Sequence, residues 1–316
     1  MREIIIDARD SGTRLNRYLA RVAAKLPASL MYKYLREKRI KLNGRRCEAS
    51  ARLAEGDILQ LYIDEEFFEL QRLQRDFMRS SHRLSIIYED ENMAALYKPA
   101  GLLSHGDKSG GDALLGRFTR YLYEKGEYEP ESSAFAPAVC NRLDRGTEGI
   151  VLAAKNAAAA AALGDIIKRR LVRKLYLCVC CGEPPKDGVY TAYMKKDGKR
   201  NLSAVRREMF EGAREITTGF RTLGRKGNLT LLEASLITGR PHQIRAHLSF
   251  LGAPVLGDQK YGNAKLNAKY GERSQLLCAY SVSFRLDEQA LAGPAAYLDG
   301  RTFSLKEPGF VNKYFK

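Results

Sequence analysis

The chain has 316 residues, of which 45% are hydrophobic and 28% charged, a composition typical of a globular protein with a buried core. Lysine and arginine number 53 against 37 acidic residues, and the net charge of +16 favours a polyanionic partner, first nucleic acid and second an anionic membrane surface. No apolar run approaches the roughly 18 residues of a membrane span, so we expect no membrane-spanning helix.

The cysteine content favours a reducing compartment. Six cysteines are present: Cys47, Cys140, Cys178, Cys180, Cys181 and Cys278. Their spacing does not match a disulfide framework. The first residues lack the apolar run of a secretion signal. We therefore expect a cytoplasmic protein with free thiols. The cluster at 178–181 lacks the second pair of ligands that a zinc site needs, so we expect no metal.

Residues 1–63 are predicted to form a small unit of their own. Apolar residues recur at helical spacing over 15–26, where Ser11 or Thr13 would cap the helix. A second amphipathic helix follows, with Ser29 as its predicted N-cap. Two short helices before a strand-rich stretch indicate a compact α+β unit.

The polar face of this unit is strongly basic. A solvated helix usually carries charges of both signs, whereas here the bias is positive over two helices and a hairpin, whose turn is predicted at Asn43-Gly44. The layout resembles the alpha-L RNA-binding motif of the small-ribosomal-subunit protein 4 type, carried by Arg14-Leu15-Asn16, Ser29, Leu42-Asn43-Gly44 and Gly56-Asp57. The resemblance implies RNA contacts from four arginines: Arg17, Arg36, Arg39 and Arg45.

The remaining chain divides into a linker and a larger domain. Residues 64–83 are polar and charged, which is typical of a linker, and residues 84–316 carry longer strands and mixed helices. Asn156 is predicted to cap an alanine-rich helix, and 172–181 reads as a long strand. Pro241 is predicted to occupy the first position of a late helix.

The most informative segment is 141–145, Asn-Arg-Leu-Asp-Arg, in which the Asp144 carboxylate lies between two arginines just before an apolar strand. On these residues alone, a salt-bridged loop and a functional site are equally good interpretations. Three further segments change that balance: 98–102 (Lys-Pro-Ala-Gly-Leu), 173–176 (Arg-Lys-Leu-Tyr) and 238–248 (Thr-Gly-Arg-Pro-His-Gln-Ile-Arg-Ala-His-Leu).

In this order, the four segments resemble the RluA-type pseudouridine synthases, over residues 84 to about 284. The resemblance implies an α+β fold, in which a small basic RNA-binding domain precedes a catalytic domain with a large, mainly antiparallel mixed sheet and a central cleft. It also implies a reaction that needs no cofactor, the isomerisation of uridine to pseudouridine in structured RNA.

The resemblance assigns roles to individual residues. Asp144 is the catalytic carboxylate, which attacks ribose C1′ as a nucleophile or removes a ribose proton as a general base; both routes stay open. Arg245 is the cation that favours its charged form, and Tyr176 stacks on the target uracil. Arg142 is expected to fill the gap that a flipped nucleotide leaves. Further substrate contacts are expected from Ile244 and Lys174.

Three positions differ from the family pattern. Asn141 stands where the family has histidine, Glu148 where it has serine, and Cys278 where it has histidine. These differences concern the local geometry and the substrate, because the Arg-Leu-Asp core is intact.

Two alternatives remain open besides a synthase acting on large-subunit (23S) ribosomal RNA, which the appended N-terminal unit favours. One is a non-catalytic RNA-binding assembly factor on the same fold, and the other is a synthase that modifies transfer RNA. In each case the partner is RNA, and we expect a monomer with no membrane or protein partner.

Overall fold

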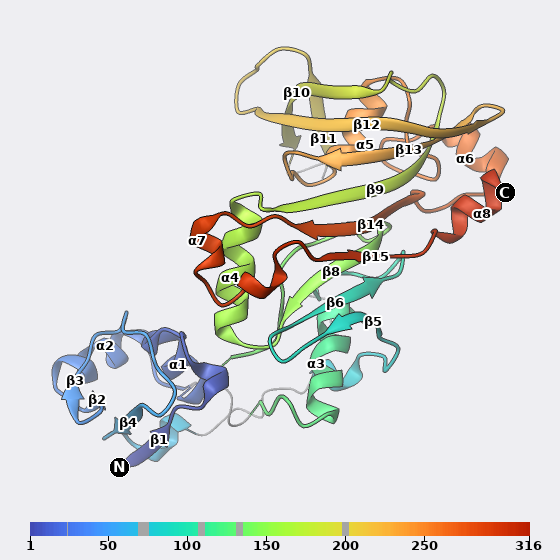
Figure 1. Cartoon of the computed structure of the whole chain (residues 1–316). Helices are drawn as coiled ribbons and strands as arrows, with labels where there is room; N and C mark the ends of the chain where they lie inside the picture. The colour runs from blue at the N-terminus through green and yellow to red at the C-terminus, as the bar shows by residue number, and fades with distance from the viewer. Residues whose placement is uncertain (24, 69–75, 107–110, 131–134, 198–201) are drawn as a thin grey trace.

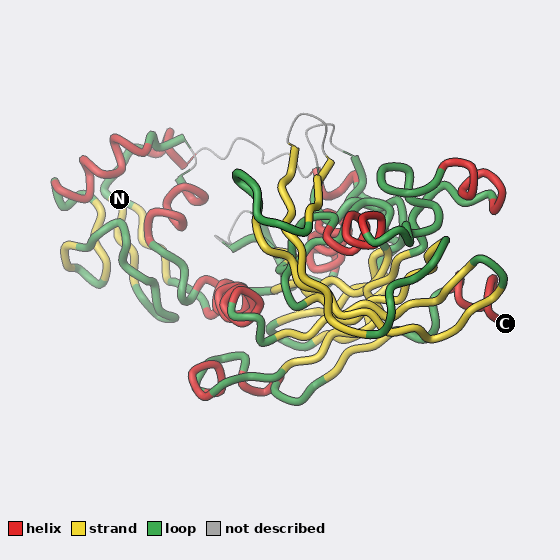
Figure 2. Tube along the Cα trace, turned by 90° about the horizontal axis from the view of Figure 1, so that it is seen from above, coloured by secondary structure: helices red, strands yellow, loops and turns green. Residues whose placement is uncertain are grey.

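The described residues form two separate sheets, one of four strands and one of eleven. Figures 1 and 2 both place the small sheet at one end of the molecule, beside the large sheet. The computed structural model describes residues 1–23, 25–68, 76–106, 111–130, 135–197 and 202–316. Within these residues, no helix combines the length and the apolar character needed to cross a bilayer.

The small sheet has the strand order β1-β4-β2-β3 with antiparallel neighbours. Its elements are β1 (Arg2–Ile5), α1 (Leu15–Val22), α2 (Ala28–Arg36), β2 (Ile40–Leu42), β3 (Arg45–Arg46) and β4 (Ile58–Leu61). Both helices share one hydrophobic cluster with the sheet, and Leu15, Leu19, Leu59 and Leu61 are completely buried in it. Asn43 and Gly44 have φ of 52° and 73°, as the predicted hairpin turn requires.

The predicted caps of the two helices are wrong. Helix α1 has Arg14 at its N-cap without a side-chain hydrogen bond, and α2 begins after Pro27, so that Ser29 lies inside the helix. The first N–H groups of α1 are instead satisfied from a distant segment. Leu15 donates to the carbonyl of Ala51 at 2.8 Å, and this long-range contact removes the need for a local cap.

The stretch 64–83 contains two short 3-10 helices, η2 (Glu65–Phe68) and η3 (Asp76–Arg79), while 69–75 lie outside the described residues. Phe68 packs in the core of the small unit, and Phe77 packs against the core of the large sheet. The stretch therefore packs against the small unit at its start and against the large sheet at its end. The bounds 64–83 of the linker stay a prediction.

The large sheet has the order β11-β10-β12-β13-β9-β14-β8-β6-β5, with β15 on β14 and β7 on β8. Its strands are β5 (Ser85–Glu89), β6 (Met93–Lys98), β7 (Ala138–Val139), β8 (Glu148–Ala154), β9 (Val172–Cys181), β10 (Gly188–Asp197), β11 (Leu202–Arg206), β12 (Arg214–Lys226), β13 (Leu229–Leu236), β14 (Leu277–Phe284) and β15 (Thr302–Ser304). Among these strands, only β14 and β8 pair in parallel. The predicted mixed, mainly antiparallel sheet is confirmed.

Helices cover both faces of the large sheet (Figure 1). Along β6, Ala94 and Leu96 pack in a cluster with α3 (Leu114–Glu124) and α5 (Gln243–Phe250). The alternate residues Met93 and Ala95 pack in a second cluster with α4 (Ala157–Lys168) and α7 (Glu288–Leu291). This alternation follows from the two-residue period of a strand. Two more helices, α6 (Ala264–Tyr270) and α8 (Gly309–Phe315), contribute to a cluster that covers the end of β9.

Two predictions about helix starts have opposite outcomes. Asn156 caps α4 as predicted, since its side-chain oxygen accepts the Ala159 N–H at 2.8 Å. Pro241 does not begin α5, because the helix starts at Gln243 after His242, which has a left-handed backbone with φ of 60°. The chain thus turns sharply just before the helix that carries Arg245.

Candidate active site

Asp144 lies on a short loop between β7 and β8, and hydrogen bonds to the loop's backbone hold it in place. Ser104 Oγ accepts the Leu143 N–H at 3.1 Å and donates to the Leu143 carbonyl at 3.0 Å. The Asp144 carbonyl accepts the Thr147 N–H at 3.0 Å. The carboxylate therefore projects from a turn whose backbone is held on both sides.

Lys98 lies fully buried against this loop. Its Nζ donates to three backbone carbonyls, at 3.0, 2.7 and 3.1 Å: those of Pro99, Leu102 and Arg145. Burial lowers the pKa of Lys98 to about 8, against the opposing charges of Asp144 and Glu148. The side chain thereby ties segment 98–102 to the loop that bears Asp144, which explains why the two segments occur together.

Arg245, on α5, meets Asp144 directly. Its Nη1 donates to Asp144 Oδ2 at 2.7 Å. The Arg245 side chain is 6% exposed and the Asp144 side chain 25% exposed. The acid is therefore accessible to a substrate while its cation is not, and the structure brings the two residues together as the sequence resemblance implies.

A second carboxylate holds the other side of Arg245. Asp258, whose side chain is completely buried, accepts Arg245 Nε at 2.6 Å and Nη2 at 2.8 Å. Asp258 Oδ1 also accepts the N–H groups of Lys260 at 2.8 Å and Tyr261 at 3.0 Å. Sequence reasoning missed this residue. The signal that was present is an acid immediately after the apolar run 253–257.

The charges of this pair reinforce one another. Burial alone would lower the pKa of Arg245, but the hydrogen bonds and charges of Asp258 and Asp144 raise it above its ordinary value. Burial alone would raise the pKa of Asp258, but Arg245 and the N–H groups of Tyr261 and Lys260 lower it. Both buried groups are consequently ionised at neutral pH.

Tyr176 and Ile244 lie in the same hydrophobic cluster as Leu143, and both are buried. Burial, together with the charge of Asp144, raises the pKa of Tyr176 above its ordinary value, so the phenol is protonated at neutral pH. Lys174 lies two residues earlier on the same face of β9, and burial lowers the pKa of Lys174. An aromatic ring and an apolar side chain thus pack in the same cluster as Leu143, the residue before Asp144.

Two polar residues near Asp144 carry further information. Arg142 is exposed, and its charge acts with burial to lower the pKa of His105. His242 places Nε2 at 3.8 Å from Asp144 Oδ1, while its Nδ1 lies 3.0 Å from the Tyr261 hydroxyl. Burial lowers the pKa of His242. Sequence reasoning gave His242 no catalytic step.

Comparison with known proteins adds to this geometry. The family model described as RNA pseudouridylate synthase matches residues 92–250. The Ribosomal large subunit pseudouridine synthase C of Rickettsia bellii (strain RML369-C) is 34% identical over 264 residues, covering 80% of this chain and 84% of the relative. The chain belongs to the RluA family of RNA pseudouridine synthases. It is therefore an enzyme of this class, which removes the non-catalytic alternative.

Other relatives of this synthase agree. An uncharacterized RNA pseudouridine synthase of Mycoplasma capricolum subsp. capricolum is 27% identical over 321 residues, covering 99% of this chain and all of the relative. The solved structure of Human RNA Pseudouridylate Synthase Domain Containing 1 superposes with a TM-score of 0.56 at 21% identity, covering 73% of this chain and 86% of the human one. The likeness in structure shows the pseudouridine synthase fold.

The three departures from the family pattern have local partners in this synthase. Asn141 Oδ1 accepts the Leu152 N–H at 2.7 Å, and so fixes the start of the loop that bears Asp144 against β8. Glu148 accepts the Tyr97 hydroxyl at 2.6 Å. Cys278 is buried opposite Glu148 in the parallel pair of strands β14 and β8. All three side chains thus serve contacts within the protein.

The basic residues of the N-terminal unit of the synthase differ in their surroundings. Arg17, Arg36 and Arg45 are exposed, whereas Arg39 stacks on the Tyr34 ring at 4.3 Å and donates Nε to the Tyr62 carbonyl at 2.8 Å. Arg39 therefore also serves the packing of this unit.

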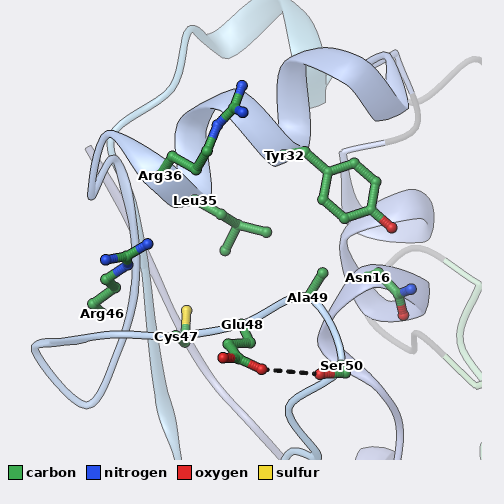
Figure 3. Close-up of a pocket in the computed structure, with 9 residues that line it drawn as sticks. All are labelled: Asn16, Tyr32, Leu35, Arg36, Arg46, Cys47, Glu48, Ala49 and Ser50. Carbon is green, nitrogen blue, oxygen red and sulfur yellow. Dashed lines mark hydrogen bonds between the residues drawn. The ribbon is translucent and has the colours of Figure 1, made fainter.

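An open pocket of about 910 Å³ lies in this N-terminal unit of the synthase, not beside Asp144 (Figure 3). Arg36 and Tyr32 of α2 line one side, and Arg46 and Glu48 line the other. The central cleft that the resemblance implies around Asp144 stays a prediction.

The cysteines of the synthase are unpaired, and the described residues form no metal-binding group. The six cysteines are free thiols, and burial raises the pKa of Cys181 to about 11. Over the described ranges, no group of three or more His, Cys, Asp or Glu side chains is placed to hold a metal ion.

Proposed function

We propose that this synthase converts specific uridines of structured RNA to pseudouridine, with Asp144 as the catalytic carboxylate. The observation that carries the proposal is the 2.7 Å contact between Arg245 Nη1 and Asp144 Oδ2 at a partly exposed acid. In this reaction the bond between ribose C1′ and base N1 breaks and a bond between C1′ and C5 forms. The C5 proton leaves to solvent while N1 gains a proton, so no oxidant or cofactor is required.

The neighbouring residues suit the remaining steps. A flipped uracil would stack on Tyr176 and pack against Ile244, and base–aromatic stacking is worth roughly 1–3 kcal/mol. Arg142, exposed beside the acid, would take the place of the extruded nucleotide. Lys174 would contact the RNA backbone. Asp144 acts either on C1′ as a nucleophile or on a ribose proton as a base, and both routes use the same ionised group.

We further propose that the substrate is large-subunit ribosomal RNA and that residues 1–63 form an RNA-binding domain of the alpha-L type. Two features support this: the relatives named as large-subunit synthases, and the exposed Arg17, Arg36 and Arg45. Two RNA-contacting units on one chain raise the effective concentration of each for the same RNA. The enzyme would work as a monomer in the cytoplasm.

Tritium release tests the reaction and the substrate together, because replacement of the C5–H bond expels the label to water. Transcripts of 23S ribosomal RNA and of a set of transfer RNAs, each made with 5-tritiated uridine, are incubated with the purified full-length chain. We expect release from the 23S transcript and none from transfer RNA. Release from transfer RNA alone would keep the reaction and overturn the ribosomal substrate, and no release from either would overturn the proposed function.

A further inference from the structure

Both groups that face the Asp144 carboxylate rest on one short turn, residues 258–261. Arg245 faces Oδ2, and Asp258 holds its Nε and Nη2. His242 faces Oδ1, and the Tyr261 hydroxyl meets its Nδ1. Neither Asp258 nor Tyr261 has a described contact with Asp144, so each would influence the acid through the residue that it holds.

The hydrogen bonds of Tyr261 favour one of the two tautomers of His242. The Tyr261 hydroxyl accepts the Ser203 N–H at 2.8 Å, which leaves its own hydrogen for His242 Nδ1 at 3.0 Å. With Tyr261 as the donor in this contact, the His242 proton lies on Nε2, and that N–H faces Asp144 Oδ1 at 3.8 Å. The separation exceeds a hydrogen bond, but such contacts often shorten when a substrate binds.

The hydrogen bonds of Asp258 determine how Arg245 meets the acid. With Nε and Nη2 both bound to Asp258, Nη1 remains for Asp144. A guanidinium group that is held by two hydrogen bonds on one side has a fixed plane. The charge of Asp258 also balances that of Arg245, so the guanidinium acts on Asp144 as a directed donor and not as an uncompensated buried cation.

The turn itself is rigid. Gly257 has φ of +82°, and a Cβ there would lie 2.0 Å from the Ser274 carbonyl oxygen, so only glycine fits. The buried Asn267 side chain accepts the Gly257 N–H at 2.8 Å and donates to the Asp258 carbonyl at 2.9 Å. The turn is therefore fixed independently of the two residues it supports.

We propose that Asp258 and Tyr261 are positioning residues of this synthase: Asp258 aims Arg245 at one oxygen of Asp144, and Tyr261 fixes the tautomer in which His242 presents an N–H to the other. The proposal rests on the proposed pseudouridine synthase reaction. A misplacement of about 1 Å at a reacting group can cost 10²-fold in rate, so loss of either support should slow turnover without weakening RNA binding.

The test measures tritium release from the 5-tritiated 23S transcript for wild type, Asp258→Asn and Tyr261→Phe. Tyr314→Phe, on the distant helix α8, serves as the matched control, since the Tyr314 hydroxyl also donates to a partly buried partner, Glu272. We expect Tyr261→Phe to lower kcat about 10-fold and Asp258→Asn on the order of 10²-fold, with KM within about threefold of wild type. The control keeps the wild-type kcat.

A double-mutant cycle separates positioning from a general structural role. If Asp258 acts through Arg245, the double variant Asp258→Asn/Arg245→Gln has the same kcat as Arg245→Gln alone. If the two residues act independently, the fold-losses in kcat of the two single variants multiply in the double variant.

Three outcomes bear on the proposal. Wild-type kcat in Tyr261→Phe, or multiplicative losses in the cycle, would overturn the positioning role while leaving the reaction intact. If Asp258→Asn does not fold, Tyr261→Phe decides alone, because it removes a single oxygen. An inactive wild type would instead overturn the reaction on which the proposal rests.

Discussion

Arg245 donates to Asp144 at 2.7 Å across 101 residues of sequence, and the same guanidinium is held by Asp258 only thirteen residues away. One cation thus joins two carboxylates of different exposure, the first partly open and the second fully buried. The buried pair gives the site its rigidity, and the exposed carboxylate is left for chemistry.

Removal of the shared cation should destabilise the fold. Arg245→Met leaves Asp258 buried without its counter-ion, and breaking a buried pair in this way costs about 3–5 kcal/mol. Urea unfolding of the full-length chain checks the value. Arg169 supplies the control, because it also contacts two aspartates, Asp165 and Asp287, but at the surface. Arg169→Met should change the unfolding free energy far less, and equal losses would contradict the account.

The close approach of β8 to β14 should exclude any side chain at residue 149. Gly149 has φ of +126°, and a Cβ there would lie 2.5 Å from Ala279 N and 2.4 Å from Ala279 O. We expect Gly149→Ala to destabilise the protein by about 3 kcal/mol or more, measured by chemical denaturation. Gly164→Ala in α4 is the control, since open space surrounds it and alanine favours a helix. A tolerated Gly149→Ala would show that the strands are spaced differently.

The protein should lose stability in acid partly through His247. This residue is buried against Thr218, and burial lowers the pKa of His247 to about 4. Between pH 6.5 and 4 the unfolded chain binds a proton here that the folded chain does not, so stability falls as pH falls through this window. The loss amounts to about 3 kcal/mol at pH 4. In His247→Gln the unfolding free energy should change less over this window, and an unchanged slope would exclude the residue as the cause.

The exposed arginines of the N-terminal unit should act through phosphate. Replacing Arg36 and Arg45 together with glutamine should lower affinity for the 23S transcript and reduce the slope of log affinity against log salt by roughly 1 to 2. Filter binding at several salt concentrations measures both. The control variant, Lys265→Gln with Lys306→Gln, removes two exposed charges of the large domain. Equal losses in both variants would contradict a specific role for the N-terminal unit.

Much of the fold could be predicted from local patterns. The strand predicted over 172–181 has the bounds of β9, because an apolar run rich in β-branched and aromatic residues marks a strand within its own sequence. Predictions that depend on distant groups did worse. The caps of α1 were wrong because carbonyls of residues 49 and 51 satisfy its first N–H groups.

The candidate site also divides into residues that the sequence identifies and residues whose place depends on distant contacts. Asp144 and Arg245 were identified through their resemblance to a family, since no local pattern joins residues 101 apart. Asp258 was missed because its importance arises only when the turn 258–261 folds against α5. His242 was noticed in the motif, but its place beside Asp144 depends on the left-handed backbone that begins the helix.

The most direct test of the central claim replaces one carboxylate oxygen of Asp144 with an amide nitrogen. Asp144→Asn keeps the shape of the side chain and removes its charge. We predict that tritium release from 23S transcript falls at least about 10³-fold, while the dissociation constant for that RNA stays within about threefold, because phosphate contacts supply most of the affinity. Turnover at the wild-type rate in Asp144→Asn, with RNA binding unchanged, would contradict the account.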